Sequence, residues 1–183
     1  MGKLIGVLVS GAGSNLQALI DAGLPVAAVA SNVAGARALD RAATARIATA
    51  VFPLDSYADR DARDAAMADW LEAHRVGLVV CAGYLHLLRP VFLDRFPAAV
   101  VNIHPALLPA FPGLRAVADA LAAGVDESGA TVHLVDHGVD TGPVLRQERV
   151  PVRVDDTVES LRARIREVEH RLLPAVVREL VEA

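Results

Sequence analysis

The sequence is poor in the residues that mark several classes of protein. A single cysteine, Cys81, excludes an intramolecular disulfide and any C-x-x-C redox or zinc motif, which fits a reducing cytosol. No apolar stretch approaches the ~20 residues of a membrane span, and the run at 4–9 is shorter than the core of a signal peptide, about 7–15 residues. We therefore expect a soluble, cytoplasmic protein that makes no contact with a membrane.

A basic surplus is also absent. The 18 lysines and arginines are outnumbered by 22 aspartates and glutamates, which gives a net charge of −4. Proteins whose main task is to bind nucleic acid normally carry an excess of positive charge, so nucleic acid is not an expected partner. Aromatic residues make up only 4% of the chain, and the core therefore has to be built from Ala, Val and Leu.

Hydrophobic residues, in contrast, are abundant. They make up 54% of the 183 residues, which is enough for a core and excludes intrinsic disorder. A chain of this length fits one compact domain, since single cores usually extend to about 100–200 residues. We predict that residues 1–183 form one domain without a linker or an internal repeat.

Short apolar segments rich in β-branched residues alternate with longer stretches of helical periodicity. The predicted strands cover 4–9, 26–30, 47–52, 78–82, 98–103, 130–136 and 144–150. The predicted helices cover 14–22, 36–45, 58–74, 114–123 and 158–180. This order predicts an α/β domain, a Rossmann-like and mostly parallel twisted sheet flanked by helices. No helix separates the last two strands, so we expect them to pair antiparallel.

The C-terminal helix has the clearest pattern. Asp156 and Glu159 have the spacing of a capping box at its start. Apolar residues then recur every three or four positions, which predicts one buried stripe. Glu169 lies at the margin of that stripe, where a carboxylate points toward the body of the protein. A solvated position on the flank is the alternative, and periodicity alone favours it.

The first glycine-rich loop, 10–16, lies between a predicted strand and a predicted helix. Gly13, Ser14 and Asn15 offer backbone N–H groups, a hydroxyl and an amide at a helix N-terminus, where anions bind. Leu16 stands where the dinucleotide fingerprint requires a third glycine, and the second strand ends in Ser-Asn rather than in an acid, which disfavours NAD. A phosphate monoester fits the loop, and a plain tight turn is the equally weighted alternative.

The segment 101–109 reads V-N-I-H-P-A-L-L-P and ends a predicted strand. Asn102 and His104 are two residues apart on extended backbone, so their side chains share a face, and Pro105 favours that conformation at His104. An amide donor beside an imidazole can hold a developing oxyanion and move a proton. Alternatively, the two side chains satisfy backbone groups at a strand end.

Three further segments contain polar or apolar candidates. Asp140 lies in a loop punctuated by Gly and Pro at the end of a strand, where functional groups are common. His133 and His137 lack a third and fourth ligand at metal spacing, so no metal is predicted, and His133 fits a hydrogen-bonded strand residue. The apolar segment 85–88 could wall a flat ring or form a buried core corner. Neither G-x-S-x-G nor a P-loop is present.

Taken together, four motifs resemble the glycinamide ribonucleotide formyltransferases of purine biosynthesis, which are folate-dependent. They are S-G-x-G-S-N-L-Q-A-L, A-G-Y-x-x-L-L, N-I-H-P-x-L-L-P-x-F-P-G and G-A-T-V-H-x-V-D-x-x-V-D-T-G-P-V, in the order of that family. With the Glu169-His170 pair they extend over nearly the whole chain. The resemblance implies transfer of a formyl group from 10-formyltetrahydrofolate to the amine of glycinamide ribonucleotide, without metal or a covalent enzyme intermediate.

The resemblance also implies a role for particular residues, with ribonucleotide bound by the N-terminal half and folate by the C-terminal half. The catalytic residues would be Asn102, His104 and Asp140. The substrate phosphate would be held by Gly13, Ser14 and Asn15, and the ribose hydroxyls by Glu169. Folate would contact Arg60, Leu85, His86, Leu87, Leu88, Asn102, Asp136, His137, Gly138, Val139 and Asp140, with Arg60 at its benzoyl-glutamate end.

The sequence departs from the family pattern in three places. His86 stands where arginine is common, Ala106 where serine is common, and 115–117 replaces a stretch that often contains histidine. Methionyl-tRNA formyltransferase and formyltetrahydrofolate hydrolase share the catalytic residues, but each normally has a further domain for which we expect no room here. A nucleotide-binding regulator or a dehydrogenase is the alternative from another class. We expect a monomer or a homodimer.

Overall fold

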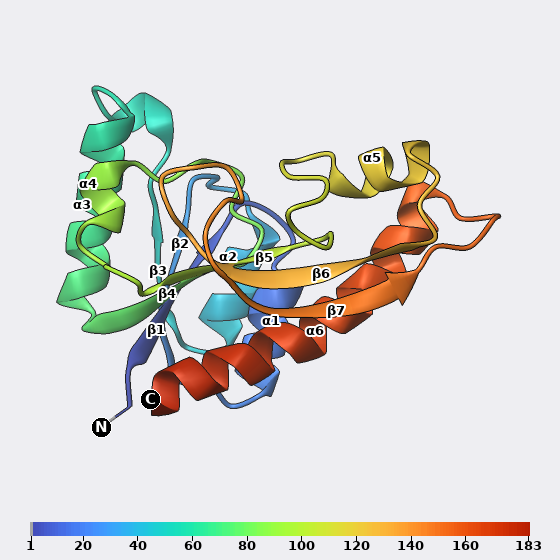
Figure 1. The fold of residues 1–183 in the computed structure, drawn as a ribbon. Helices are drawn as coiled ribbons and strands as arrows, with labels where there is room; N and C mark the ends of the chain where they lie inside the picture. Colours follow the sequence, from blue (N-terminus) through green and yellow to red (C-terminus); the bar gives the residue numbers. More distant parts are fainter. Residues whose placement is uncertain (1) are drawn as a thin grey trace.

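A computed structural model describes residues 2–183 and shows a seven-stranded sheet with helices on both faces (Figure 1). The strand order is β3-β2-β1-β4-β5-β6-β7. The strands are β1 (Leu4–Val9), β2 (Val26–Ser31), β3 (Ala48–Val51), β4 (Val76–Cys81), β5 (Val100–His104), β6 (Glu127–Leu134) and β7 (Val144–Pro151). Every predicted strand is present, and the predicted α/β class is confirmed.

The first five strands are parallel, and the order reverses between β1 and β4. Loops that leave the carboxyl ends of strands on either side of such a reversal diverge, and the crevice between them is where open α/β sheets bind ligands. The predicted antiparallel pairing of β6 with β7 is confirmed. In addition, β6 runs antiparallel to β5, which the sequence did not indicate.

The helices follow the predicted order, with two short additions. They are α1 (Ser14–Asp21), α2 (Arg37–Thr44), η1 (Leu54–Ser56), α3 (Arg60–Ala73), α4 (Pro90–Leu93), α5 (Ala116–Ala122) and α6 (Val158–Glu182). The 3-10 turn η1 and the single turn α4 are too short to show a helical period in the sequence, so periodicity could not predict them.

Two apolar layers cover the two faces of the sheet. Alternate residues of one strand belong to different layers, because side chains on extended backbone point to opposite faces. Val7 packs in the layer under α1, α2 and α6, whereas Leu8 packs with Met67 and Leu71 of α3. Both layers are dominated by aliphatic side chains, as the composition requires.

The start of α6 differs from the predicted capping box. Thr157 is the N-cap residue, its side chain accepts from Ser160 N, and Ser160 Oγ accepts from Thr157 N. The prediction of an Asp156–Glu159 box was therefore wrong by one position. Asp156 instead accepts from Arg153 N and pairs with Arg164, so its carboxylate is occupied before the helix begins.

One strand boundary also moved for a local reason. The fifth strand begins at Val100 rather than at the predicted residue 98, because Ala98 has a φ of +51°, which extended backbone does not allow.

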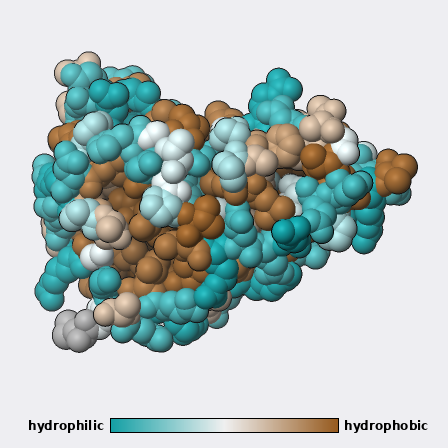
Figure 2. Space-filling view, viewed as in Figure 1, coloured by the Kyte–Doolittle hydropathy of each residue, from teal (hydrophilic) through white to brown (hydrophobic). Residues whose placement is uncertain are grey.

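Figure 2 shows apolar side chains over the middle of the viewed face and hydrophilic ones along its left and lower edges. Within residues 2–183, no helix has the length and apolar character needed to cross a bilayer.

Candidate active site

The polar candidates gather at the carboxyl edge of the parallel strands. Asn102 and His104 lie at the end of β5, and both share its face, as their spacing predicted. His104 is 4% exposed and Asn102 is half-buried. Across the antiparallel ladder, Asn102 lies opposite His133 and His104 lies opposite Thr131, so β6 completes one side of the site.

Asp140 reaches this site from the loop between β6 and β7. Its φ is +54°, and the loop around it is fixed by Asp136, whose Oδ1 accepts from Gly138 N at 3.0 Å and from Thr141 Oγ1 at 2.7 Å. Gly142 is required by space, since a Cβ there would lie 1.9 Å from the carbonyl oxygen of Leu134. The loop therefore turns tightly enough to aim Asp140 back at β5.

Asp140 contacts both predicted partners. Its Oδ2 lies 3.3 Å from His104 Nδ1, and its Oδ1 lies 3.5 Å from Asn102 Nδ2. His133 Nε2 also lies 3.5 Å from Oδ1, and Gly113 N donates to Oδ2 at 2.8 Å. The His133 contact, the Gly113 hydrogen bond and the His104 imidazole together lower the pKa of Asp140 to about 2, against the opposing effect of burial. The side chain is a carboxylate at neutral pH.

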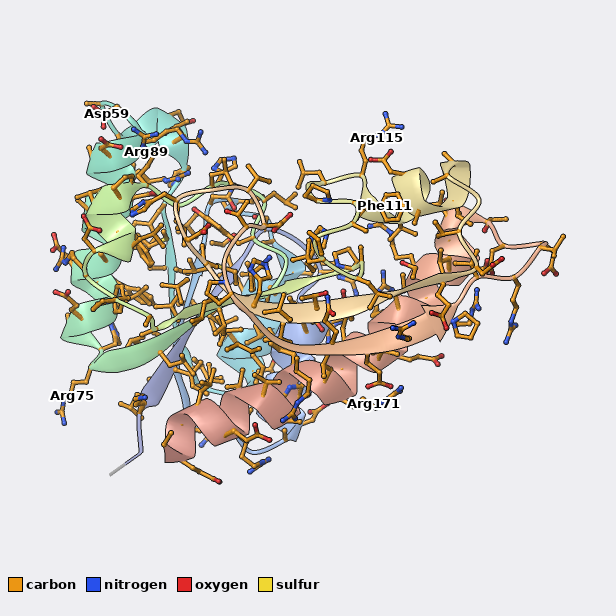
Figure 3. All side chains as sticks on the ribbon, in the orientation of Figure 1. Asp59, Arg75, Arg89, Phe111, Arg115 and Arg171 are labelled. Atoms are coloured by element: carbon orange, nitrogen blue, oxygen red, sulfur yellow. The ribbon has the colours of Figure 1, made fainter. Side chains whose placement is uncertain are left out.

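Both ring nitrogens of His104 face acceptors. Nδ1 faces the Asp140 carboxylate, and Nε2 lies 2.8 Å from the carbonyl oxygen of Phe111. A neutral imidazole donates through one nitrogen, whereas the imidazolium donates through both. The surroundings of His104 are therefore matched to the protonated ring. Figure 3 labels Phe111 in the segment that precedes α5.

His133 belongs to the site, although the sequence predicted only that it is a hydrogen-bonded residue of a strand. Its Nδ1 donates to the carbonyl oxygen of Leu134 at 2.8 Å. Its Nε2 lies 3.1 Å from Asn102 Nδ2 and 3.5 Å from Asp140 Oδ1. His133 thereby fixes the orientation of the Asn102 amide, and the register of β5 against β6, which period-two patterning does not specify, brings them together.

The segment after β5 folds over the site and is held by β6 and β7. Thr131 Oγ1 donates to the carbonyl oxygen of Ala106 at 2.6 Å and accepts from Leu108 N at 3.1 Å. Gln147 Nε2 donates to the carbonyl oxygen of Leu108 at 2.7 Å. These hydrogen bonds hold the segment in the position in which the Phe111 carbonyl group contacts His104 and the Gly113 N–H group contacts Asp140.

The glycine-rich loop after β1 forms a second group of donors. Gly13 has a φ of +74°, and a Cβ there would lie 2.5 Å from the Cβ of Ala38 in α2. The first backbone bond of α1 runs from Gln17 N to the carbonyl oxygen of Gly13, so the N–H groups of 14–16 point out of the helix N-terminus. Arg41 Nε holds the carbonyl oxygen of Ala12 at 2.8 Å.

Glu169 faces this loop and is 9% exposed. Its Oε2 accepts from Asn15 Nδ2 at 3.0 Å, and burial raises the pKa of its carboxyl group despite that bond and the positive charges of Arg166 and Arg162. The structure thus decides between the two interpretations of the sequence, in favour of a carboxylate turned inward. A hollow of about 590 Å³, lined in part by Ser14 and His170, adjoins the start of α1.

The segment 85–88 forms a third part of the carboxyl edge. Leu85 is 58% exposed and Leu87 is 51% exposed, whereas Leu88 is buried. Of the two interpretations of this segment, burial in the core therefore applies only to Leu88. Arg60 Nη2 donates to the carbonyl oxygen of Leu87 at 3.4 Å. Within residues 2–183, no group of three or more His, Cys, Asp or Glu side chains has the arrangement of a metal site.

A model of one protein family covers nearly all of this architecture. The family is described as formyl transferase, and its model matches residues 3–177. The chain belongs to the formyl transferase family. The resemblance inferred from the four motifs is therefore confirmed.

Relatives of this formyltransferase include one of similar length and one much longer. The phosphoribosylglycinamide formyltransferase of Mycobacterium tuberculosis is 49% identical over 175 residues, which are 93% of this chain, and the match covers 81% of that protein. The trifunctional purine biosynthetic protein adenosine-3 of Chironomus tentans is 46% identical over 184 residues. That match covers 96% of this chain and 13% of the longer protein.

Solved structures agree with the fold of this formyltransferase. The crystal structure of glycinamide ribonucleotide transformylase 1 from Symbiobacterium toebii has a TM-score of 0.97 and 47% identity, and the match covers 99% of this chain and 88% of that chain. Phosphoribosylglycinamide formyltransferase from Streptococcus pneumoniae has a TM-score of 0.94 and 43% identity, with coverage of 97% and 98%. The mixed sheet with its antiparallel end is thus shared.

Two of the positions at which this formyltransferase departs from the family pattern make few polar contacts through their side chains. Ala106 is fully buried, and its methyl group needs no polar partner there. Arg115 precedes α5 with its side chain 81% exposed and its Nε 3.5 Å from Asp119 Oδ1. None of the contacts of the catalytic candidates described above involves either residue.

Proposed function

We propose that this chain is a phosphoribosylglycinamide formyltransferase, which transfers the formyl group of 10-formyltetrahydrofolate to the amine of glycinamide ribonucleotide in purine biosynthesis. The observation that carries the proposal is the convergence of Asn102, His104 and Asp140, from two elements, in a chain of the formyl transferase family. The products are formylglycinamide ribonucleotide and tetrahydrofolate. The substrates are small molecules, and the mechanism uses the chain's own side chains.

In the proposed reaction the substrate amine, as free base, attacks the formyl carbon. A C–N bond forms there, the bond to the folate nitrogen breaks, and the proton of the attacking amine passes to that leaving nitrogen. The tetrahedral oxyanion needs donors aimed at it in advance. Asn102 Nδ2 carries two hydrogens and lies 3.1 Å from His133 Nε2 and 3.5 Å from Asp140 Oδ1, so the oxyanion would replace the more distant Asp140 oxygen as an acceptor.

His104 supplies the second donor. Its imidazolium form is supported by Asp140, the role that a carboxylate plays beside histidine in other acyl transfers. Because the Phe111 carbonyl oxygen lies 2.8 Å from Nε2, the formyl oxygen has to replace it there. We therefore include a movement of the segment 110–113 in the binding of substrate. Asp140 would also order a water molecule that relays the proton.

The ribonucleotide binds in this proposal at the start of α1. The N–H groups of 14–16 and the Ser14 hydroxyl offer donors to the phosphate, and the helix dipole favours the negative charge. Glu169 would accept the ribose hydroxyls. The Asn15 side chain fits a ribose hydroxyl as well, because its acceptor Oδ1 is buried and lacks a hydrogen-bond partner in the described part of the chain, while its Nδ2 holds Glu169.

The folate ring would lie between the exposed segment 85–88 and the loop 136–140. Leu85 and Leu87 supply apolar surface, and Val139, which is 45% exposed, faces solvent from the loop. Arg60, at the first position of α3, would meet the benzoyl-glutamate end through charge pairing. We also propose a cytoplasmic location and a monomeric or homodimeric state.

The test follows the absorbance change of folate turnover with and without glycinamide ribonucleotide. Transfer requires both substrates, so turnover that depends on the ribonucleotide supports the proposal. Turnover with folate alone would instead indicate a hydrolase, and turnover with formyl-accepting tRNA but not with ribonucleotide would indicate a tRNA formyltransferase. Either result, or no turnover at all, contradicts the proposed function.

A further inference from the structure

An arginine lies buried beneath the proposed folate wall. Arg63, on the inner side of α3, has no exposed surface, and it is paired with Asp64, which is equally buried. Its Nη2 lies 2.6 Å from Asp64 Oδ1, and its Nε donates to the same oxygen at 2.8 Å. Burying a charged pair is expensive, and apolar residues of similar volume often serve stability as well or better. The remaining contacts of the pair therefore indicate what it is for.

Those contacts lead to His86. Arg63 Nη1 lies 2.6 Å from His86 Nδ1. Because a guanidinium only donates, His86 Nδ1 accepts, and the proton of the neutral ring sits on Nε2. On that side of the ring, the Asn32 amide nitrogen lies 3.4 Å from Nε2, and since both nitrogens carry hydrogen they make no hydrogen bond. His86 is thus held at Nδ1 by a residue from another element.

The ends of the same segment are tied down as well. Asp64 Oδ2 accepts from Arg89 N at 2.8 Å, and Ser10 Oγ accepts from Leu85 N at 3.0 Å. The Ser10 hydroxyl in turn donates to Asn32 Oδ1 at 2.6 Å. Figure 3 places Arg89 close to Asp59, at the end where α3 begins. A segment without regular structure is therefore fixed at its first and second residues, and just beyond its last, by side chains of other elements.

We propose that Arg63 is a positioning residue of the formyl-folate site, which acts through His86 and, with Asp64, holds residues 85–88 against the folate ring. The inference rests on the proposed function of this segment. It also gives a reason for His86, which stands where the family commonly has arginine. In this chain the positive charge is instead on Arg63, which is buried beneath the segment, and the side chain at position 86 has to accept a hydrogen bond from it.

The arrangement makes the segment sensitive to acid. Protonation of His86 would place an N–H against the Arg63 guanidinium, and burial together with the charges of Arg63 and Arg60 lowers the pKa of His86 below its usual 6.5, with Asp64 opposing. The neutral, ordered form therefore holds above that lowered pKa and is lost as the pH falls through it. The charged or titratable groups that face the ring are Arg60, Arg63, Asp64 and Tyr84.

The first test splits the Michaelis constants of the two substrates. In His86→Leu, Arg63 loses its acceptor, and we expect the KM for 10-formyltetrahydrofolate to rise roughly tenfold while the KM for glycinamide ribonucleotide stays constant. His86→Asn keeps an acceptor oxygen and should recover most of the loss. The matched control is His74→Leu, whose Nδ1 contacts the carbonyl oxygen of Trp70 at the far end of α3. Equal losses in the Leu and Asn variants, or no loss in either, overturn the proposal.

The second test is the pH profile of the same constant. In the wild type, the KM for folate should rise as the pH falls through the lowered pKa of His86, and thus only below the usual value of 6.5. In His86→Asn the rise should disappear, because the variant has no titrating ring at this position. A wild-type profile that matches that of His86→Asn between pH 8 and pH 5 contradicts the positioning role.

A third measurement does not depend on activity. In protein labelled with ¹⁵N-histidine, the His86 resonances should show an unprotonated Nδ1 and a protonated Nε2. The double variant Arg63→Gln/Asp64→Asn removes both buried charges together, and with its fold checked by circular dichroism it should lose that tautomer preference. A protonated Nδ1 in the wild type refutes the contact.

If the tautomer is as expected but no formyl transfer occurs, the proposed function fails and the contact stands. If formyl transfer occurs without the KM split, the proposed function stands and the positioning role of Arg63 fails.

Discussion

The two substrate regions of the carboxyl edge are built in different ways. The loop after β1 presents backbone N–H groups, and its shape depends on one glycine and on neighbours a few tens of residues away, such as Ala38. The catalytic group presents side chains from β5, β6 and the loop before β7, which strand pairing brings together. A site made of backbone depends on its conformation, whereas a site made of side chains depends on the identity of each group. The following predictions test that difference.

The largest effect is expected at the side-chain site. Asp140→Asn keeps the shape but removes the charge that supports the His104 imidazolium, and we expect kcat to fall roughly a thousandfold. The KM for the ribonucleotide should stay within a few-fold of the wild type, because the phosphate loop is untouched. Steady-state kinetics measure both constants. A kcat close to that of the wild type would remove Asp140 from the mechanism.

The backbone site should fail when its conformation is blocked. In Gly13→Ala the new methyl group meets Ala38 at 2.5 Å and has to adopt a positive φ, so we expect a loss of about 2–4 kcal/mol in the free energy of unfolding. Gly124→Ala is the control, since Gly124 has a φ of +65° and no atom within 4 Å of the added Cβ. It should lose about 1–2 kcal/mol. Urea denaturation compares the variants, and equal losses would argue against the close approach to α2.

The side-chain site should also respond to acid. Because the pKa of Asp140 is lowered to about 2, its carboxylate contributes stability that is fully present above the unfolded value near 3.8 and is lost as the pH falls toward 2. The contribution is about 2 kcal/mol. The unfolding free energy of the wild type should therefore drop more than that of Asp140→Asn between pH 5 and pH 2.5. Parallel curves for the two proteins would contradict the shift.

The smallest effect is expected from side chains of the backbone site. In Ser14→Ala/Asn15→Ala the N–H groups at the start of α1 remain, so the KM for the ribonucleotide should rise only about tenfold with kcat nearly unchanged. An unchanged KM would remove these residues from phosphate binding. A loss of several hundredfold would show that side chains, rather than backbone, dominate the loop.

Local patterns predicted much of this arrangement. The alternation of strands and helices follows from periods of 2 and 3.6, and the shared face of Asn102 and His104 follows from the first of them. Helix boundaries were harder, because Asp156 and Thr157 are both good N-caps and only packing selects one. The short turn α4 carries too few residues to show a period.

Other features could not be predicted because they depend on distant contacts. The sequence left Glu169 between a solvated and an inward position, and its burial against the Asn15 loop is a property of how α6 packs. Arg63 is a stronger case, since a charged residue on a helix is normally assigned to the surface. Its place under the 85–88 segment could not be inferred from periodicity.

The sequence by itself determined the order of elements, the apolar faces and the chemical types at each strand end, because these depend on neighbours along the chain. Tertiary structure decided which of those groups meet: the register that sets His133 against Asn102, the turn that brings Asp140 to His104, and the buried pair beneath His86. The reason is that backbone geometry has a short period, whereas hydrogen bonds and ion pairs between elements exist only after the sheet has paired and its helices have packed.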